Sequence, residues 1–190
     1  MPVILGGRRR GTKLLVPPGR GVRPTLARVR EALFSMIASQ CGSFADLNVL
    51  DPFAGSGALG LEAFSRGASR IDFIEKSKSH YDLLQKNIQK LDAMNECHTV
   101  LGETPKALAR LPYIKYDLVM CDPPYAAGLL PQTLQALVDD KRLTDGAIVS
   151  LELDPNTQIE IPEEFTILKN KQYAQCLIIL LKFTNNTASN

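Results

Sequence analysis

The stretch LNVLDPFAGSGALG, residues 47–60, places a glycine-rich loop between a short apolar segment and a helical one. We expect its first five residues to form a strand and Ala58–Arg66 to form a helix. Gly55 and Gly57 let the backbone turn tightly and approach a ligand, and Gly60 permits close packing of the helix on the strand. This order of strand, glycine loop and helix predicts the first unit of a sheet that binds a ligand at the loop.

From residue 47 onward, segments typical of strands alternate with segments typical of helices. Strands connected by helices form right-handed crossovers, so we expect ligands at the carboxyl ends of mostly parallel strands. The predicted fold class is therefore α/β, with a Rossmann-like, mostly parallel sheet and a C-terminal antiparallel hairpin. Beyond the first unit, the expected strands are 70–75, 99–101, 118–121 and 147–153, the helices 78–91, 105–111 and 129–138, and the hairpin 165–168 with 175–182.

Two carboxylates near the glycine loop indicate which ligand it binds. Asp51 ends the first strand, where a carboxylate would lie poorly beside a pyrophosphate but well beside a cationic group. Glu75 ends the second strand, where it could accept both hydroxyl protons of a ribose. An adenosine with a positively charged amino acid and no phosphate is S-adenosylmethionine, which is the predicted cofactor, with S-adenosylhomocysteine as its product.

Other interpretations of these residues stay open. The G-x-G-x-x-G spacing is also that of a dinucleotide-binding loop, Asp51 could shape a turn, and Glu75 could be a surface charge. Glu103 follows the third strand and could hydrogen-bond the adenine or face solvent. The predicted cofactor-binding residues are Asp51, Phe53, Ala54, Gly55, Ser56, Gly57, Glu75 and Glu103.

A second motif, Asp122-Pro123-Pro124-Tyr125, follows the apolar run 116–121. Prolines lack the N–H groups that a sheet ladder needs, so the strand ends with an acidic and an aromatic side chain on a rigid loop. The carboxylate and backbone carbonyls could accept the protons of a flat amine while the ring stacks on its face. We predict Asp122, Pro123, Pro124 and Tyr125 as catalytic residues for methyl transfer to an exocyclic amine of a nucleobase. Asp-Pro-Pro also ends strands that have no such chemistry.

The first 30 residues are strongly basic. They contain seven Arg, one Lys and no acidic residue, whereas the remaining 160 residues carry 14 basic and 20 acidic side chains. This segregation predicts an arm that binds a polyanion, although a disordered or solubilising tail has the same composition. We expect a small hairpin of residues 3–5 and 13–16 around a basic tip, followed by a helix from Thr25 to about Cys41.

Composition sets further limits. A chain of 190 residues can bury a real core in one domain with a small appendage. Four scattered cysteines suit reduced thiols in a cytoplasmic protein, and with two histidines and no CxxC motif we expect no metal. The N-terminus lacks the order of a secretory signal, and the apolar run 176–181 is too short to span a bilayer. We expect a monomer without membrane contact, divided into an N-terminal extension 1–42, a catalytic domain 43–183 and a polar tail 184–190.

With these motifs in view, the chain resembles the RsmD family, bacterial methyltransferases that modify guanine N2 in 16S rRNA. The resemblance covers about residues 4–182, and its N-terminal part is the specific one. The family usually has Asp or Asn where this chain has Glu103. The matching residues are Gly6-Gly7, Arg10-Gly11, Lys13-Leu14, Arg23-Pro24-Thr25, RVREALF at 28–34, FAGSGALGLEA at 53–63 and DPPY at 122–125.

The resemblance implies S-adenosylmethionine-dependent methylation of guanine 966 at N2, with 16S rRNA or a small-subunit assembly intermediate as the partner. Asp122 and the carbonyl of Pro123 would hold the amine protons and stabilise the positive charge that develops on the nitrogen. Tyr125 would stack on the extruded base. The expected RNA contacts are Arg8, Arg9, Arg10, Lys13, Arg23, Arg28 and Arg30.

Three other functions share parts of this pattern. An adenine-N6 or cytosine-N4 DNA methyltransferase would use the same loop, but the chain has no room for a separate target-recognition domain of any size. A nicotinamide-dependent oxidoreductase is disfavoured by Asp51 and by the lack of a persuasive hydride-transfer site. A non-catalytic rRNA-binding assembly factor with a vestigial cofactor site is disfavoured by the intact Asp51 and Asp122.

Overall fold

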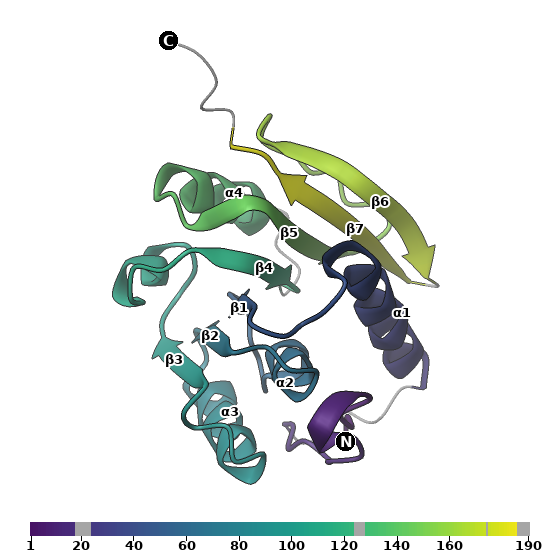
Figure 1. Ribbon diagram of the computed structural model, residues 1–190, viewed down its shortest axis with the longest axis vertical. Coiled ribbons are helices and arrows are strands. Elements are labelled where there is room, and N and C mark those ends of the chain that lie inside the picture. The colour runs from purple at the N-terminus through teal and green to yellow at the C-terminus, as the bar shows by residue number, and fades with distance from the viewer. Residues whose placement is uncertain (18–23, 124–127, 174, 186–190) are drawn as a thin grey trace.

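The computed structural model describes residues 1–17, 24–123, 128–173 and 175–185, with the backbone alone at residues 24–26. Within these ranges seven strands form one sheet in the order β3-β2-β1-β4-β5-β7-β6 (Figure 1). Strands β3, β2, β1, β4 and β5 pair in parallel, whereas β7 pairs antiparallel with β5 and β6. This confirms the predicted α/β class. The strands are β1 (Asn48–Asp51), β2 (Arg70–Glu75), β3 (Cys97–Leu101), β4 (Tyr116–Cys121), β5 (Leu143–Leu153), β6 (Phe165–Tyr173) and β7 (Cys176–Phe183).

Helices cover both faces of the sheet (Figure 1). In the described ranges they are α1 (Pro24–Cys41), α2 (Ala58–Ser65), α3 (Lys78–Lys90) and α4 (Leu129–Asp139), with short 3-10 turns η1 (Gly7–Arg9) and η2 (Lys106–Arg110). Helices α1, α2 and α3 share one core, and α4 shares the other with η2. Val49 of β1 packs in the first core and Leu50 in the second. Burial on both faces explains why residues 118–121 of the central strand β4 form a continuous apolar run.

The order of the strands reverses beside β1. The chain runs outward from β1 to β2 and β3, then returns to β4 on the other side of β1. In open α/β sheets, ligands bind beyond the carboxyl ends of the strands at such a reversal. Asp51 ends β1, Glu75 ends β2 and Asp122 follows β4, so all three carboxylates belong to this edge.

The expected elements are present, but some of their ends differ from prediction. The segment 105–111 forms only the single 3-10 turn η2. Strand β5 begins four residues before the expected start, because Leu143 pairs with Tyr116 ahead of a register shift. Strand β6 continues past Leu168 to Tyr173, because its polar residues pair with β7 through backbone groups that do not depend on side-chain polarity.

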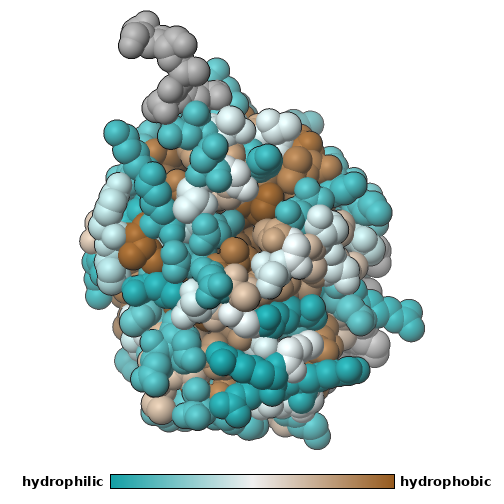
Figure 2. All heavy atoms as spheres, in the orientation of Figure 1, coloured by the Kyte–Doolittle hydropathy of each residue, from teal (hydrophilic) through white to brown (hydrophobic). Residues whose placement is uncertain are grey.

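The surface is mainly hydrophilic. Figure 2 shows hydrophilic side chains over most of the visible face, with hydrophobic atoms exposed between them near its middle. The large hydrophobic side chains that are exposed in the described ranges are Met1, Met94, Tyr113 and Ile167. Where the chain is described, no helix combines the length and the apolar character needed to cross a membrane.

Candidate active site at the carboxyl edge of the sheet

Backbone hydrogen bonds hold the glycine loop between β1 and α2. The N–H of Ala54 donates to the carbonyl of Ile74 at 3.0 Å, and the N–H of Gly57 donates to the carbonyl of Ala54 at 2.7 Å. Gly57 has a φ of 86°, a left-handed conformation that residues with side chains rarely adopt. A Cβ at Gly55 would meet no atom within 4 Å, so the backbone there borders open space. The loop is therefore fixed in shape and has room for a ligand beside it.

Helix α2 packs directly on the sheet at Gly60. A Cβ built on Gly60 would lie 2.2 Å from Cε1 of Phe73, a distance that no side chain tolerates. This confirms the predicted close packing of helix on strand. It also brings the N–H of Gly60 within 3.1 Å of Oδ2 of Asp51, to which it donates a hydrogen bond.

Asp51 is 1% exposed at the end of β1. Its second oxygen, Oδ1, makes no hydrogen bond of ordinary geometry to any described residue. The pKa of Asp51 is raised to about 7, chiefly by burial and also by the nearby carboxylates of Asp122 and Glu75. A cationic ligand group beside Oδ1 would supply the missing partner and favour the ionised carboxylate.

Glu75 is buried at the end of β2, so it is not a surface charge. Its Oε2 accepts from the N–H of Gly55 at 2.7 Å, and its Oε1 accepts from the N–H of Ser77 at 2.6 Å. The Nδ1 atom of His80 lies 3.9 Å from Oε1. Each carboxylate oxygen retains a lone pair that a ribose hydroxyl could use. The structure therefore adds a function that was not predicted, because Glu75 also holds the glycine loop in place.

The other predicted cofactor residues differ in exposure. Ala54 is buried, and Phe53 and Ser56 are half-buried. Glu103 is exposed, and its Oε1 lies 3.8 Å from Nζ of Lys76, which is also exposed. This geometry favours the solvent-facing interpretation of Glu103 over a contact with adenine.

Strand β4 leads directly into the Asp-Pro-Pro-Tyr motif. Its last residue is buried, whereas Asp122 is exposed and Pro123 is half-buried. Asp122 lies close enough to Asp51 to raise the pKa of that buried carboxyl. Pro124 and Tyr125 lie outside the described residues. Of the predicted catalytic group, the structure therefore brings Asp122 and Pro123 to the same edge as the glycine loop.

A fourth carboxylate, Glu152, lies half-buried near the end of β5. Its pKa is raised to about 8, chiefly by burial and next by the charge of Asp122. Glu152 was not among the predicted site residues. The signal that could have found it is an acidic side chain within an otherwise apolar strand, one strand away from the Asp-Pro-Pro-Tyr motif.

The N-terminal residues form the expected hairpin with a basic tip, which we call the N-terminal hairpin (residues 2–14). Val3 pairs antiparallel with Lys13, and the N–H of Ile4 donates to the carbonyl of Thr12 at 3.0 Å. The turn η1 lies between these segments. Ile4 and Leu14 are fully buried in the core that covers β1. The hairpin is therefore part of the packed molecule.

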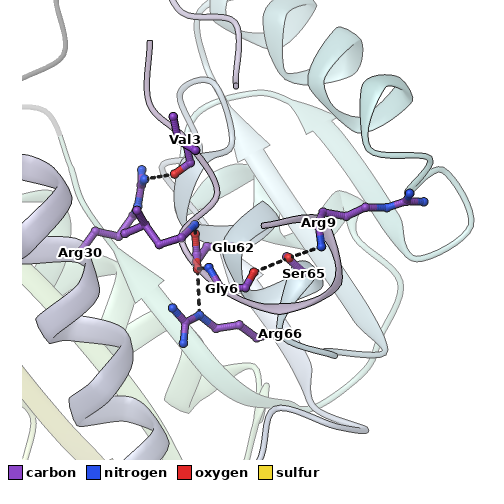
Figure 3. A network of polar contacts seen from close by, with 8 residues as sticks. Val3, Gly6, Arg9, Arg30, Glu62, Ser65 and Arg66 are labelled. Atoms are coloured by element: carbon purple, nitrogen blue, oxygen red, sulfur yellow. Dashed lines mark hydrogen bonds and ion pairs between the residues drawn. The ribbon is translucent and has the colours of Figure 1, made fainter. Parts of the chain in front are cut away.

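Glu62 of α2 is the main polar anchor of the N-terminal hairpin (Figure 3). It is completely buried, and its carboxylate accepts from the N–H groups of Leu5 at 2.7 Å and Gly6 at 2.8 Å. The Nε of Arg66 donates to the same carboxylate at 2.9 Å. Ser65 adds a bond from its hydroxyl to the carbonyl of Gly6 at 2.6 Å. The charge of Glu62 is thus matched by three donors, as a buried carboxylate requires.

The predicted RNA contacts occupy different environments. Arg8 lies 3.4 Å from Glu96 and stacks over the ring of Phe64, with its guanidinium carbon 4.1 Å from the ring centroid. Arg9 lies 3.5 Å from Asp92. Their side chains remain 50% and 40% exposed, and Arg10, Lys13 and Arg28 are exposed. These residues stay available to a polyanion, and their contacts with RNA stay a prediction.

Arg30 and Arg23 differ from this group. Arg30 is half-buried and donates a hydrogen bond to the carbonyl of Val3 (Figure 3). Burial lowers the pKa of Arg30, against the attraction of the carboxylates of Glu62 and Glu152. Its guanidinium therefore joins α1 to the N-terminal hairpin and lies in the interior, where Glu62 and Glu152 attract it. Arg23 lies outside the described residues.

Asn87 of α3 was not predicted, yet it joins two functional segments. It is completely buried, its Oδ1 accepts from the N–H of Leu15 at 2.8 Å, and its Nδ2 donates to the carbonyl of Leu15 at 2.9 Å. The same Nδ2 donates to the carbonyl of Ser56 at 2.9 Å. The chain just after the N-terminal hairpin and the glycine loop are thus fixed by one side chain.

A ligand that carries a cationic group and a ribose fits this site. The site offers open space at Gly55, an oxygen of Asp51 without a partner among the described residues, and the two acceptor oxygens of Glu75. Across the described ranges, no three side chains of His, Cys, Asp or Glu are grouped as metal ligands. The four cysteines are free thiols, and burial raises the pKa of Cys97 to about 12.

In this sheet β7 lies antiparallel beside β5, the glycine loop follows β1 and the Asp-Pro-Pro motif follows β4. This combination defines the class of Rossmann-like α/β methyltransferases. A family model described as Conserved hypothetical protein 95 matches residues 3–182. The chain belongs to this family, which is the RsmD family of its curated relatives.

Two relatives and one solved structure illustrate the similarity. The chain is 36% identical over 173 residues to Ribosomal RNA small subunit methyltransferase D of Escherichia coli. The matched region covers 90% of this chain and 85% of the relative. Its identity to the protein of the same name from Haemophilus influenzae is 34% over 175 residues, or 88% of this chain and 86% of the relative. The solved structure of yhhF from Escherichia coli superimposes with a TM-score of 0.84 at 34% identity, covering 97% of this chain and 98% of that one.

Proposed function

We propose that this protein transfers a methyl group from S-adenosylmethionine to the N2 amine of a guanine in 16S rRNA of the small ribosomal subunit, with guanine 966 as the target. The observation that carries the proposal is the proximity of Asp51 and Asp122 at the ends of the neighbouring strands β1 and β4, beside the glycine loop. Membership of a family whose relatives are named small-subunit rRNA methyltransferases supports the same reaction.

Three residues are suited to hold the cofactor, which would supply the methyl group. Oδ1 of Asp51, buried and without a hydrogen-bond partner among the described residues, would accept from the ammonium group of its amino-acid part. Glu75 would accept from the ribose hydroxyls while it continues to hold the N–H of Gly55. The uncrowded backbone at Gly55 would let the cofactor approach the loop closely.

Asp122 would hold and polarise the target amine. The amine of guanine is a poor nucleophile, because its lone pair is delocalised into the ring. Fixing it in line with the methyl group can supply about 7–11 kcal/mol of the barrier. Asp122, exposed at the end of β4, would accept one amine proton, and the carbonyl of Pro123 would accept the other. The carboxylate would then stabilise the positive charge that develops on nitrogen. Tyr125 would stack on the base, which must be unpaired or extruded.

The basic surface of the N-terminal hairpin would bind the RNA backbone. Arg10, Lys13 and Arg28 are exposed, and Arg8 and Arg9 keep about half of their side-chain surface open. Contacts of this kind release counterions from the RNA, so binding should weaken steeply as the salt concentration rises. Arg23 would also contact the RNA backbone. Arg30 would act through its contacts to Val3 and the carboxylates, since its guanidinium faces the interior.

The test is methyl transfer from labelled S-adenosylmethionine to purified small subunits, followed by mapping of the modified nucleotide. Asp122→Ala should lower turnover by about a hundredfold or more, while calorimetry shows near-normal cofactor binding. Asp140→Ala, which removes an exposed carboxylate beyond α4, is the control and should keep full activity. Retained turnover in Asp122→Ala would refute the assignment.

Nucleoside mass spectrometry after incubation with rRNA and with DNA separates the proposed reaction from adenine-N6 or cytosine-N4 methylation of DNA. Methyl label in adenine or cytosine, or rRNA binding without any transfer, would overturn the proposed reaction.

A further inference from the structure

Strands β4 and β5 run in parallel, and Cys121 pairs with Leu151 near their carboxyl ends. Asp122 and Glu152 each follow this pair by one residue, so the register places them beside each other. Side chains alternate along a strand, and Leu151 belongs to the core on the α4 side. Glu152 therefore points to the opposite face, the face of α1 and α2. The side chain of Asp51 lies on this face too, because its Oδ2 accepts from the N–H of Gly60 in α2.

The surroundings of Glu152 do not neutralise it by a direct ion pair. No salt bridge between described residues includes it, and its Oε2 accepts only a long contact from Sγ of Cys176 at 3.8 Å. Arg30 attracts it from α1, whereas Asp122 and Asp51 repel it, and its pKa is raised to about 8. Burying a carboxyl among like charges costs stability. A site that needs an acceptor at this position would explain why one is present.

A second polar group marks the same strand face. Ser150 precedes Glu152 by two residues, so both side chains lie on one side of β5. Ser150 is 1% exposed, and its Oγ has no hydrogen-bond partner in the described part of the chain. Buried polar groups are normally paired, so an unpaired hydroxyl beside a poorly paired carboxyl is unusual for a purely structural strand.

The donors of guanine fit two adjacent carboxyls. Its Watson–Crick edge carries the N1–H beside the N2 amine, whereas adenine has an acceptor at N1. Enzymes that take a base out of its stack identify it by hydrogen bonds to this edge. A carboxyl next to the one that holds the amine is suited to accept from N1–H. Both the protonated and the ionised carboxyl retain an acceptor oxygen for this bond.

We propose that Glu152 is a specificity-determining residue that accepts the N1–H of the target guanine while Asp122 holds its N2 amine. This inference rests on the proposed function, because it assumes that guanine N2 is methylated. Glu152 would select guanine over a base that has an amine but no neighbouring N–H. Arg30 would position Glu152 from α1.

The test combines variants of Glu152 with a substituted base. Small subunits are reconstituted with 16S rRNA that carries either guanine or 2-aminopurine at the position that the wild-type enzyme methylates. 2-Aminopurine keeps the amine but has a bare ring nitrogen in place of N1–H. We expect the wild type to prefer guanine in kcat/KM by about tenfold or more, since an acceptor left without its donor is penalised. Glu152→Met should lower kcat/KM for guanine by about tenfold to a hundredfold and leave 2-aminopurine nearly unchanged.

Two controls exclude a merely structural effect. Glu152→Gln keeps an acceptor oxygen and the shape of the side chain, so it should retain guanine activity within a few-fold. Glu163→Met changes an exposed carboxylate before β6 and should keep the wild-type preference. Equal losses of Glu152→Met on both bases, or a wild-type enzyme that does not prefer guanine, would overturn the role of Glu152. Absence of N2-methylguanine in wild-type reactions would instead overturn the proposed function.

Discussion

Replacing Glu62 by alanine should loosen the N-terminal hairpin and destabilise the whole chain. The substitution removes the acceptor for two backbone N–H groups, those of Leu5 and Gly6, and for Nε of Arg66. The two N–H groups would then lie half-buried without a partner in the folded chain. Arg66 would lose its bond to the helix, although its guanidinium still stacks over the ring of Phe34 at 4.8 Å.

The size of the effect follows from these three bonds. Leu5 and Gly6 are only partly buried, so water can replace part of each bond and the loss is about 1 kcal/mol per N–H, the low end for an unsatisfied donor. The Arg66 side chain is 22% exposed, so its charge-assisted bond adds about 1 kcal/mol. We expect a loss of about 3 kcal/mol in the free energy of unfolding. For a chain of this size, that corresponds to a fall in Tm of about 6–12 °C.

Urea unfolding followed by circular dichroism measures the global loss, and limited trypsin digestion at the arginines of η1 measures local opening of the hairpin. Glu163→Ala is the matched control, because that carboxylate is exposed. Glu62→Gln should fall between the control and Glu62→Ala, since one acceptor oxygen remains. If Glu62→Ala unfolds at the same urea concentration as the control and is cut at the same rate, Glu62 does not anchor the hairpin.

Two further changes test the glycine loop and its carboxylate. The pKa of Asp51 is about 7 in the folded protein against an ordinary value of 3.8, so its contribution to stability is present in full below about pH 4 and is lost as the pH rises through 7. Asp51→Asn should therefore be more stable than the wild type at pH 8 and nearly equal to it at pH 4. Urea unfolding at both pH values measures this. A difference in the free energy of unfolding that does not depend on pH would contradict the expectation. Gly60→Ala should cost about 1–3 kcal/mol, because its Cβ would meet the ring of Phe73. Gly128→Ala, where a Cβ meets nothing within 4 Å, should unfold close to the wild type; equal urea midpoints for the two glycine variants would refute the packing argument.

Local patterns were sufficient for the glycine loop and most of the sheet. The turn at Gly57 and the close packing at Gly60 are consequences of residues within one strand–loop–helix unit. The apolar run of the central strand β4 was also recognisable, because burial on both faces leaves no polar alternation there. Their ends were less predictable, since β6 gains its last residues by pairing with β7 rather than from its own composition.

The residues that were missed depend on contacts far apart in sequence. Glu62 appears as an ordinary polar position of a helix, and its burial depends on N–H groups 56 and 57 residues earlier. Asn87 likewise depends on Leu15, which is 72 residues away. Glu152 is adjacent to Asp122 only through the pairing of β4 with β5. Neighbouring sequence does not encode such partners, so only the folded chain reveals them.

The same long separations determine when the N-terminal hairpin can dock during synthesis. The hairpin is translated before Glu62, Asn87 and Lys90, which bind its backbone and the chain just after it. These three residues follow the groups they contact by 56 to 77 residues. The arginine-rich tip of the hairpin therefore has no docking site until α2 and α3 have emerged. Closing loops of this length is slow compared with forming a local helix. The surface proposed to bind rRNA is thus made before the helices that hold it, and it can dock only after they have been made.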